Sequence, residues 1–209
     1  MVLGFDQMRE QRILIIPPLF DEANKFRHQI FQIMRLFDDQ GVDVFCPDLP
    51  GCNESRQPHG EQTIAGWRKA VAAAASHFRA TRLVAFRAGS WLAPENLEGW
   101  LFAPPKPQQV LRSLLRAHGL AQREAGGAAD GGKMLESAKV EGITIAGWHL
   151  GPQLVAELDC EAPSLSSLHR VLGQADIGGT GLWLRSENSY DAAQAQALVD
   201  EVMGEGRNP

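Results

Sequence analysis

The chain has 209 residues, of which 44% are hydrophobic and 22% charged, and its net charge is −5. This composition is typical of a soluble globular protein, and the acidic balance excludes general nucleic-acid and anionic-membrane binders, which need a basic surface. No segment approaches the about 20 apolar residues of a membrane helix, and no signal peptide is recognisable. The thiols lack metal-ligand spacing, which predicts a cytoplasmic protein with three reduced cysteines, Cys46, Cys52 and Cys160.

The first half of the sequence alternates between two hydrophobic patterns. Short continuous apolar runs predict strands buried on both faces, and apolar residues at every third or fourth position predict amphipathic helices. The predicted strands are Ile13–Ile16, Val42–Cys46, Leu83–Phe86 and Trp100–Ala103, and the predicted helices are Asn24–Gln40 and Thr63–Phe78, with a short helical piece after Phe86. This order indicates an α/β protein, with a mostly parallel sheet and helices on both faces.

The second half is less regular, which predicts a reduced C-terminal half within a single domain spanning residues 1–209. The glycine-rich stretch Gly119–Lys133 is expected to be a mobile loop, so residues around 104–138 form a flexible cap or loop insertion that could act as a lid. The other predicted elements are a helix at Gln108–Ala117, a strand or hairpin at Val140–Trp148, a helix at Pro152–Leu158, strands at Leu168–Leu172 and Leu182–Leu184, and a helix at Tyr190–Met203.

Several motifs narrow the α/β class. The loop DLPGCNES at residues 48–55 resembles the D-x-x-G-x-G-x-S loop of α/β-hydrolases, and PPLFDEANKFR at residues 17–27 stands where their oxyanion-hole loop is expected. The segments GWLFAPPKPQQVLRSLLRAH and KVEGITIAGWHLGPQLVAEL resemble those of one group. Together, over residues 12–160, these motifs resemble the exosortase A system-associated hydrolases, of the type that lacks the usual serine. The resemblance implies an α/β-hydrolase fold in a bacterial protein, and a partner or ligand in an exosortase or exopolysaccharide system.

The stretch FRAGS, residues 86–90, occupies the strand-to-helix junction that reads G-x-S-x-G in α/β-hydrolases. Small residues flank the turn, but Arg87 holds the place of the nucleophilic serine. A guanidinium stays protonated and cannot attack an acyl group, although it binds carboxylates and phosphates in bidentate fashion. Two interpretations stay open: Arg87 binds an anionic ligand, or it pairs with a nearby acid such as Glu22 and holds the loops together.

The histidine of the usual triad is also absent from its expected loop, Arg185–Ser189. Because two members are missing, the sequence favours a protein without serine-hydrolase activity, and leaves it open whether any enzyme activity survives. The alternative is a hydrolase or acyltransferase with a rearranged site, in which Ser90 or Cys52 acts with His149 or His169. For each of these residues a structural role is the simpler interpretation.

A polar cluster follows the first predicted strand and matches the resembled family's E-x-N-K-x-R pattern. Its members are Glu22, Asn24, Lys25 and Arg27. With Arg87 and Ser90 they form the predicted site for a small anionic ligand or a partner protein, with no cofactor and no metal. The competing interpretation is that these residues form the capped, solvated first turn of a helix.

Overall fold

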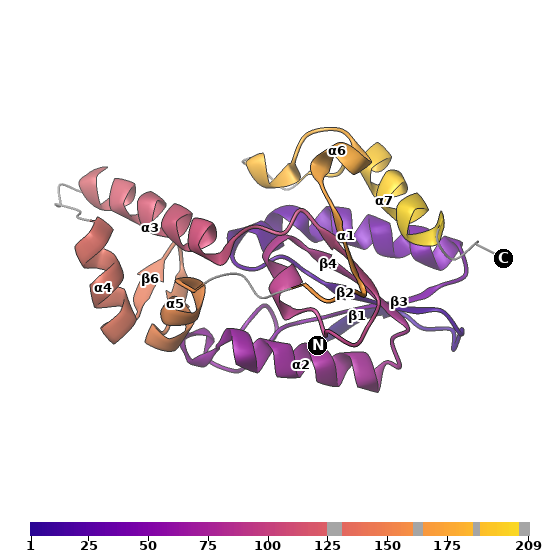
Figure 1. Ribbon diagram of the computed structural model, residues 1–209, viewed down its shortest axis with the longest axis horizontal. Coiled ribbons are helices and arrows are strands. Elements are labelled where there is room, and N and C mark those ends of the chain that lie inside the picture. Colours follow the sequence, from indigo (N-terminus) through magenta and orange to yellow (C-terminus); the bar gives the residue numbers. More distant parts are fainter. Residues whose placement is uncertain (125–130, 161–164, 186–188, 205–209) are drawn as a thin grey trace. The chain divides into compact units, whose positions relative to one another are not determined.

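The computed structural model describes residues 1–124, 131–160, 165–185 and 189–204 (Figure 1). Its main element is a six-stranded sheet in the order β1-β3-β2-β4-β5-β8. The strands are β1 (Val2–Phe5), β2 (Arg12–Ile16), β3 (Asp43–Pro47), β4 (Arg82–Phe86), β5 (Gly99–Phe102) and β8 (His169–Leu172). β1 pairs with β3 in antiparallel fashion, and every other neighbouring pair is parallel. The predicted mostly parallel α/β sheet is therefore confirmed.

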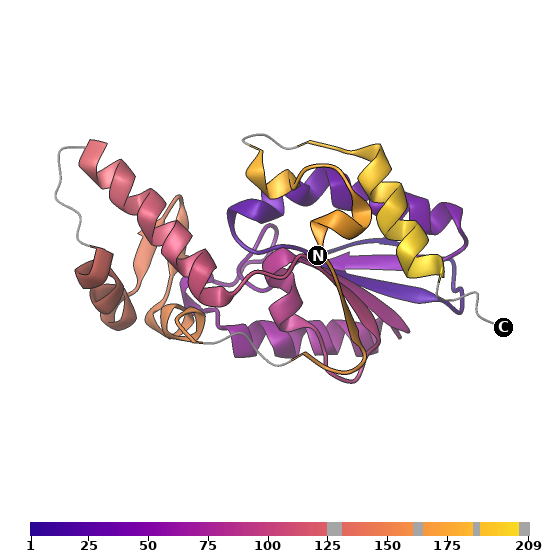
Figure 2. The ribbon, with the colours of Figure 1, turned by 45° about the horizontal axis from the view of Figure 1, so that its top comes forward.

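Helices cover both faces of this sheet. On one face, α1 (Asp21–Asp39) and α7 (Ala192–Gly204) lie side by side and share a core with Val84 and Phe86 of β4 (Figure 2). α2 (Ile64–His77) lies on the other face (Figure 1), where Phe45 of β3 stacks on Phe78 just beyond the helix. Alternate strand residues face opposite sides, so the continuous apolar runs of the sequence supply both cores.

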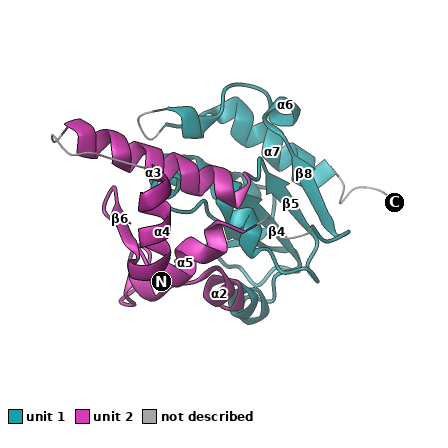
Figure 3. Ribbon diagram, turned by 60° about the vertical axis from the view of Figure 1, so that its left-hand side comes forward, with its two compact units in different colours: residues 1–47, 71–104, 165–209 teal, residues 48–70, 105–164 magenta. Residues whose placement is uncertain are grey.

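The chain divides into two compact units, which Figure 3 distinguishes by colour. Unit 1 comprises residues 1–47, 71–104 and 165–209 and holds the sheet; unit 2 comprises residues 48–70 and 105–164. Unit 2 contains α3 (Pro107–Glu124), α4 (Gly131–Glu141), α5 (Pro152–Leu158), the short 3₁₀ helix η1 (His59–Glu61) and a hairpin of β6 (Ile143–Ile145) and β7 (Trp148–Leu150). The helix predicted at Pro152–Leu158 is present, and the strand or hairpin predicted at Val140–Trp148 is a hairpin that runs from Ile143 to Leu150, with Val140 in α4.

Two local predictions were wrong. Gly119 does not begin a loop, because α3 continues to Glu124 with Gly119 on its buried face, and the glycine-rich residues 125–130 lie outside the described part of the chain. Leu182–Leu184 is a 3₁₀ turn, η3, and not a strand. This turn buries Leu182 and leaves Leu184 77% exposed, since it packs Trp183 against Phe26 of α1 instead of joining the sheet.

No described helix is both long and apolar enough to cross a membrane.

Candidate functional site

The elbow turn is preserved although its serine is not. β4 ends at Phe86, and Arg87 begins the 3₁₀ helix η2 (Arg87–Leu92) with a φ of +52°. A Cβ on Gly89 would lie 2.2 Å from the carbonyl oxygen of Pro17, so only glycine allows the turn to approach the end of β2 this closely. The glycine two residues after Arg87 is therefore required by this close contact with Pro17.

Three of the non-glycine residues with a positive φ lie near the elbow. Arg87 follows β4, Ala103 follows β5 with a φ of +47°, and Phe20 precedes α1 with a φ of +57°. Side chains with a Cβ rarely adopt positive φ, and such residues persist where the surrounding structure holds them, often at functional sites. These three residues lie at the carboxyl ends of the parallel strands, where α/β proteins bind their ligands.

The side chain of Arg87 is held from three directions. Its Nε and Nη2 donate to the two carboxylate oxygens of Glu22, at 2.9 and 3.1 Å, in a bidentate ion pair. Its Nη1 donates to the carbonyl oxygen of Ala103 at 2.6 Å. The guanidinium carbon lies 3.9 Å from the ring centroid of Trp183. Arg87 and Glu22 are only 12% and 25% exposed, so this clamp is largely shielded from water.

Lys25 belongs to the same cluster. Its Nζ lies 3.0 Å from a carboxylate oxygen of Asp21 and donates to the Trp183 carbonyl at 3.3 Å. Trp183 thus meets Lys25 through its backbone and Arg87 through its ring. Two cations, Arg87 and Lys25, face two carboxylates, Glu22 and Asp21, and their formal charges cancel.

The remaining members of the predicted polar cluster lie elsewhere on α1. Asn24 and Arg27 are exposed, whereas Arg87, Glu22 and Lys25 come together. Trp183 and Ala103 had no place in the predicted site. No spacing signal in the sequence indicates them, because Trp183 comes from a turn that resembles a strand and Ala103 contributes only its carbonyl group.

Ser90 is not placed as a nucleophile. It is 5% exposed, and its hydroxyl is directed toward the carbonyl oxygen of Ala85 at 3.5 Å, the outer limit of a hydrogen bond. The hydroxyl therefore points back to β4, and its contact is a local structural one, although the acceptor is in the strand and not in the helix as expected.

His169 lies at the amino ends of the parallel strands, whereas the elbow lies at their carboxyl ends. It pairs in register with Gly99 at the start of β5, whereas Phe86 is level with Leu172, three residues farther along β8. Three strand residues span about 10 Å. There the Nε2 of His169 forms a hydrogen bond with the carbonyl oxygen of Pro94 at 3.1 Å. His169 therefore cannot serve as a base for Ser90 in this structure.

Cys52 and His149 both belong to unit 2. Burial, together with the negative charge of Asp48, raises the pKa of the Cys52 thiol to about 11, so it is protonated near neutral pH and a poor nucleophile. The His149 Nδ1 lies 3.0 Å from the Thr144 hydroxyl across the β6–β7 hairpin, and its carbonyl oxygen bonds the Nδ1 of His59 at 2.8 Å. These contacts give His149 a structural role.

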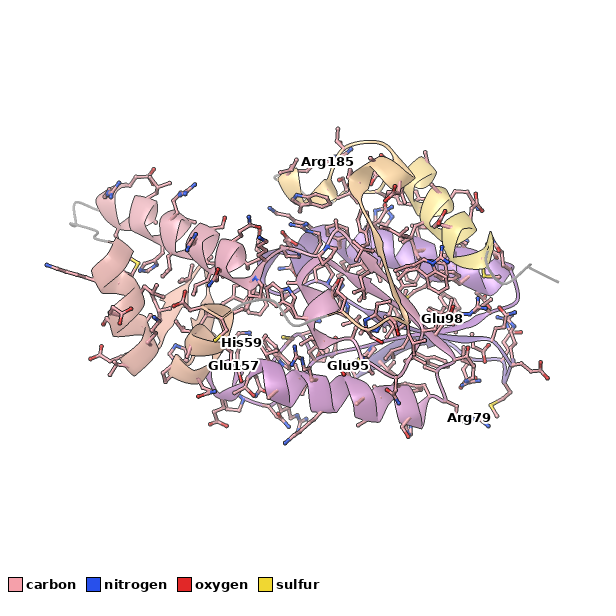
Figure 4. All side chains as sticks on the ribbon, viewed as in Figure 1. His59, Arg79, Glu95, Glu98, Glu157 and Arg185 are labelled. Atoms are coloured by element: carbon pink, nitrogen blue, oxygen red, sulfur yellow. The ribbon has the colours of Figure 1, made fainter. Side chains whose placement is uncertain are left out.

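The loop that would carry the triad histidine is only partly described. Arg185, labelled in Figure 4, lies at the start of this loop. It donates from Nη1 to the Ser189 hydroxyl at 3.1 Å and from Nη2 to the Thr180 hydroxyl at 3.2 Å, and residues 186–188 lie outside the described part. Across the residues that the structure places, no group of three or more His, Cys, Asp or Glu side chains could hold a metal ion.

Comparison with known proteins supports the fold alone. No protein-family model matches the chain, and no curated protein matches it. Among solved structures, Est1E from Butyrivibrio proteoclasticus with bound ferulic acid is similar at 12% identity and a TM-score of 0.57, over 98% of this chain and 94% of that one. The α/β-hydrolase domain-containing protein 10 from mouse is 12% identical, with a TM-score of 0.55 over 98% and 93% of the two chains. The Exiguobacterium antarcticum esterase is 9% identical, with a TM-score of 0.54 over 99% and 95%. The chain therefore has the α/β-hydrolase fold, with an arginine clamp where the nucleophile elbow stands.

Proposed function

We propose that this chain is a binding protein with the α/β-hydrolase fold and that it has no serine-hydrolase activity. The observation that carries the proposal is the position of Arg87. It occupies the strained tip of the elbow, and Glu22 and the Ala103 carbonyl hold its guanidinium. Acyl transfer requires a nucleophile at that tip with a base within hydrogen-bond reach. A clamped guanidinium supplies neither.

The clamp also limits how an anion could bind at the elbow. Glu22 already uses the bidentate edge of Arg87, and Asp21 lies beside Lys25. A ligand carboxylate or phosphate would have to displace Glu22, or use the remaining N–H groups of Arg87 and the ammonium of Lys25. Anion binding by Arg87, Lys25 and Ser90, with Asn24 and Arg27 on the exposed side of α1, is thus a second candidate that depends on exchange of the internal carboxylate.

Labelling with a fluorophosphonate probe, read by intact mass, tests the first proposal. We expect no phosphonylation of the wild-type chain and no turnover of p-nitrophenyl butyrate above the buffer rate. Stoichiometric phosphonylation at Ser90, or rapid alkylation of Cys52 by iodoacetamide at neutral pH, would contradict the proposal. Either result would indicate a hydrolase or acyltransferase with a rearranged site.

The resemblance to exosortase A system-associated hydrolases supplies a context for the binding role. We propose that the ligand or partner belongs to an exosortase or exopolysaccharide system, and that the protein acts in the cytoplasm with its thiols reduced. Deleting the gene in the host and measuring secreted polysaccharide tests this context. Reduced secretion, restored by the wild-type gene, supports it, and unchanged secretion contradicts it.

A further inference from the structure

Unit 2 carries a hollow between α3 and α4 that is independent of the elbow. Its volume is about 430 Å³, within the range of about 300–1,000 Å³ that is usual for small-molecule sites. The residues that define it are Arg112, Leu115, Arg116, Leu120, Met134 and Leu135. Those on α3 recur at intervals of three and four residues, so a single face of the helix lines the hollow.

The more buried side chains of the lining are apolar, and its exposed arginines carry positive charge. Leu115 is only 7% exposed, and Met134 and Leu135 are half-buried, whereas Arg112 and Arg116 are exposed. Arginine stems commonly cover apolar surface while their guanidinium groups stay in water. Hydrocarbon surface thus lies deeper in this hollow than the charges that border it.

Two cations of the hollow, Arg112 and Arg116, are not paired as Arg87 is at the elbow. Within the described part of the chain, neither Arg112 nor Arg116 lies in an ion pair, in contrast to Arg87 with Glu22. A third arginine, Arg123, extends the same lining, and none of its described residues is acidic. The protein as a whole carries a net charge of −5, so this positive charge is concentrated at one place. Such a concentration favours an anionic ligand.

We infer that this hollow binds a single amphipathic anion, a molecule with one hydrocarbon chain and a phosphate or carboxylate headgroup. Arg112 and Arg116 stand one helical turn apart, with Cβ atoms about 5–6 Å from each other, and can approach one headgroup together. The hydrocarbon chain lies against Leu115, Leu120, Met134 and Leu135. Leu115 is buried and Met134 and Leu135 are half-buried, so most of this apolar surface lies between the two helices, where a single hydrocarbon chain can enter, and Leu120 borders it at 52% exposure.

Isothermal titration calorimetry with dodecyl phosphate, below its critical micelle concentration, tests this inference on the full chain. We expect saturable binding at one site per chain. R112Q/R116Q should weaken binding by about tenfold or more, because each charge-assisted hydrogen bond contributes on that scale. Leu120→Asn, at a side chain that is 52% exposed, should weaken it by a smaller factor. The matched control R35Q/K69Q removes two exposed cations from α1 and α2 and should leave binding unchanged.

Two further titrants separate the parts of the ligand. Dodecyl maltoside has the same chain without a charge, and inorganic phosphate has the charge without a chain; each should bind at least tenfold more weakly than dodecyl phosphate. Equal binding of the maltoside, equal binding by R112Q/R116Q, or no binding of dodecyl phosphate would each overturn the inference. Flotation with phosphatidylglycerol vesicles that needs Arg112 and Arg116, without binding of the monomeric amphiphile, would assign the surface to a membrane and also overturn it.

Discussion

The guanidinium carbon of Arg87 lies 3.9 Å from the ring centroid of Trp183, so the tip of the elbow is covered by an aromatic face from a distant turn. Trp183 in turn stacks on Phe26 of the core at 6.4 Å, with an angle of 8° between the ring planes. A residue that replaces a nucleophile is thereby built into the packing of unit 1. Substitutions in this cluster should change folding stability as well as any binding.

Replacing either partner of the Arg87–Glu22 pair should destabilise the protein non-additively. Arg87→Ala and Glu22→Ala each leave a shielded charge without its partner, and the coupling energy from the double-mutant cycle should be about 1–3 kcal/mol. Denaturant unfolding of the wild type, both single variants and the double variant measures it. Additive effects would mean that the pair contributes nothing specific, which would favour a ligand-binding role for Arg87.

Trp183→Ala should lower the unfolding free energy by about 2–4 kcal/mol, through lost packing on Phe26 and lost contact with the guanidinium of Arg87. Trp183→Phe keeps an aromatic face over Arg87 and should recover more than half of that loss. Leu184→Ala, at a neighbouring side chain that is 77% exposed, is the control and should change stability little. Equal losses in Trp183→Ala and Trp183→Phe would argue against the stacking contribution.

Arg87→Ser restores the elbow serine but should not restore hydrolysis. His169 lies at the amino end of β8, away from the elbow, and the His149 Nδ1 already contacts the Thr144 hydroxyl at 3.0 Å, so neither candidate histidine is positioned as a base for the new serine. We expect p-nitrophenyl butyrate turnover no more than tenfold above the wild-type rate. A larger gain, abolished by phosphonylation at position 87, would show that a usable base lies near the elbow.

The Cys52 thiol should react slowly with iodoacetamide at neutral pH, and its rate should rise about tenfold per pH unit toward pH 11, since the thiolate is the nucleophile and burial raises its pKa to about 11. The folded state holds this proton more tightly than the unfolded state, whose thiol titrates near 9.0. Stability should therefore fall as pH rises from 9 to 11. Cys52→Ser should remove that part of the decline, and an unchanged decline would contradict the assignment.

Asp43 should be among the residues least tolerant of substitution. Its carboxylate is 0% exposed and accepts from the Arg12 guanidinium at 2.7 Å and from the backbone N–H groups of Gln7 and Arg9 at 2.9 Å each. Asp43→Ala leaves Arg12 buried without this partner and should cost about 3–5 kcal/mol. Asp39→Ala, at an exposed carboxylate of α1, provides the comparison by thermal unfolding and should have an effect near zero.

The sequence predicts the central strands well because they are buried on both faces. A short continuous apolar run such as Ile13–Ile16 is typical of such a strand. It also predicts the elbow, because the close approach of the turn to Pro17 requires a glycine at position 89. The edge strand β1 escapes prediction because Val2 and Leu3 are 40% and 48% exposed and show no buried run. Trp183 escapes it because packing on Phe26, and not local periodicity, selects the turn.

The candidate site was only partly predictable. The sequence offered Glu22 as one partner for Arg87, and the structure joins them. It could not exclude His169, because strand register decides which end of β8 lies level with the elbow. It favoured a structural role for Cys52, but it could not show that burial raises the pKa of that thiol.

The Arg87–Glu22 pair has a consequence for how related chains diverge. Each partner is costly without the other, so the two positions, 65 residues apart in sequence, should change together across homologues: arginine with glutamate, or serine with a residue that leaves the elbow open. A family pattern built around the serine alone would miss the first type. A pattern that links both positions, with glycine at position 89, would detect both types.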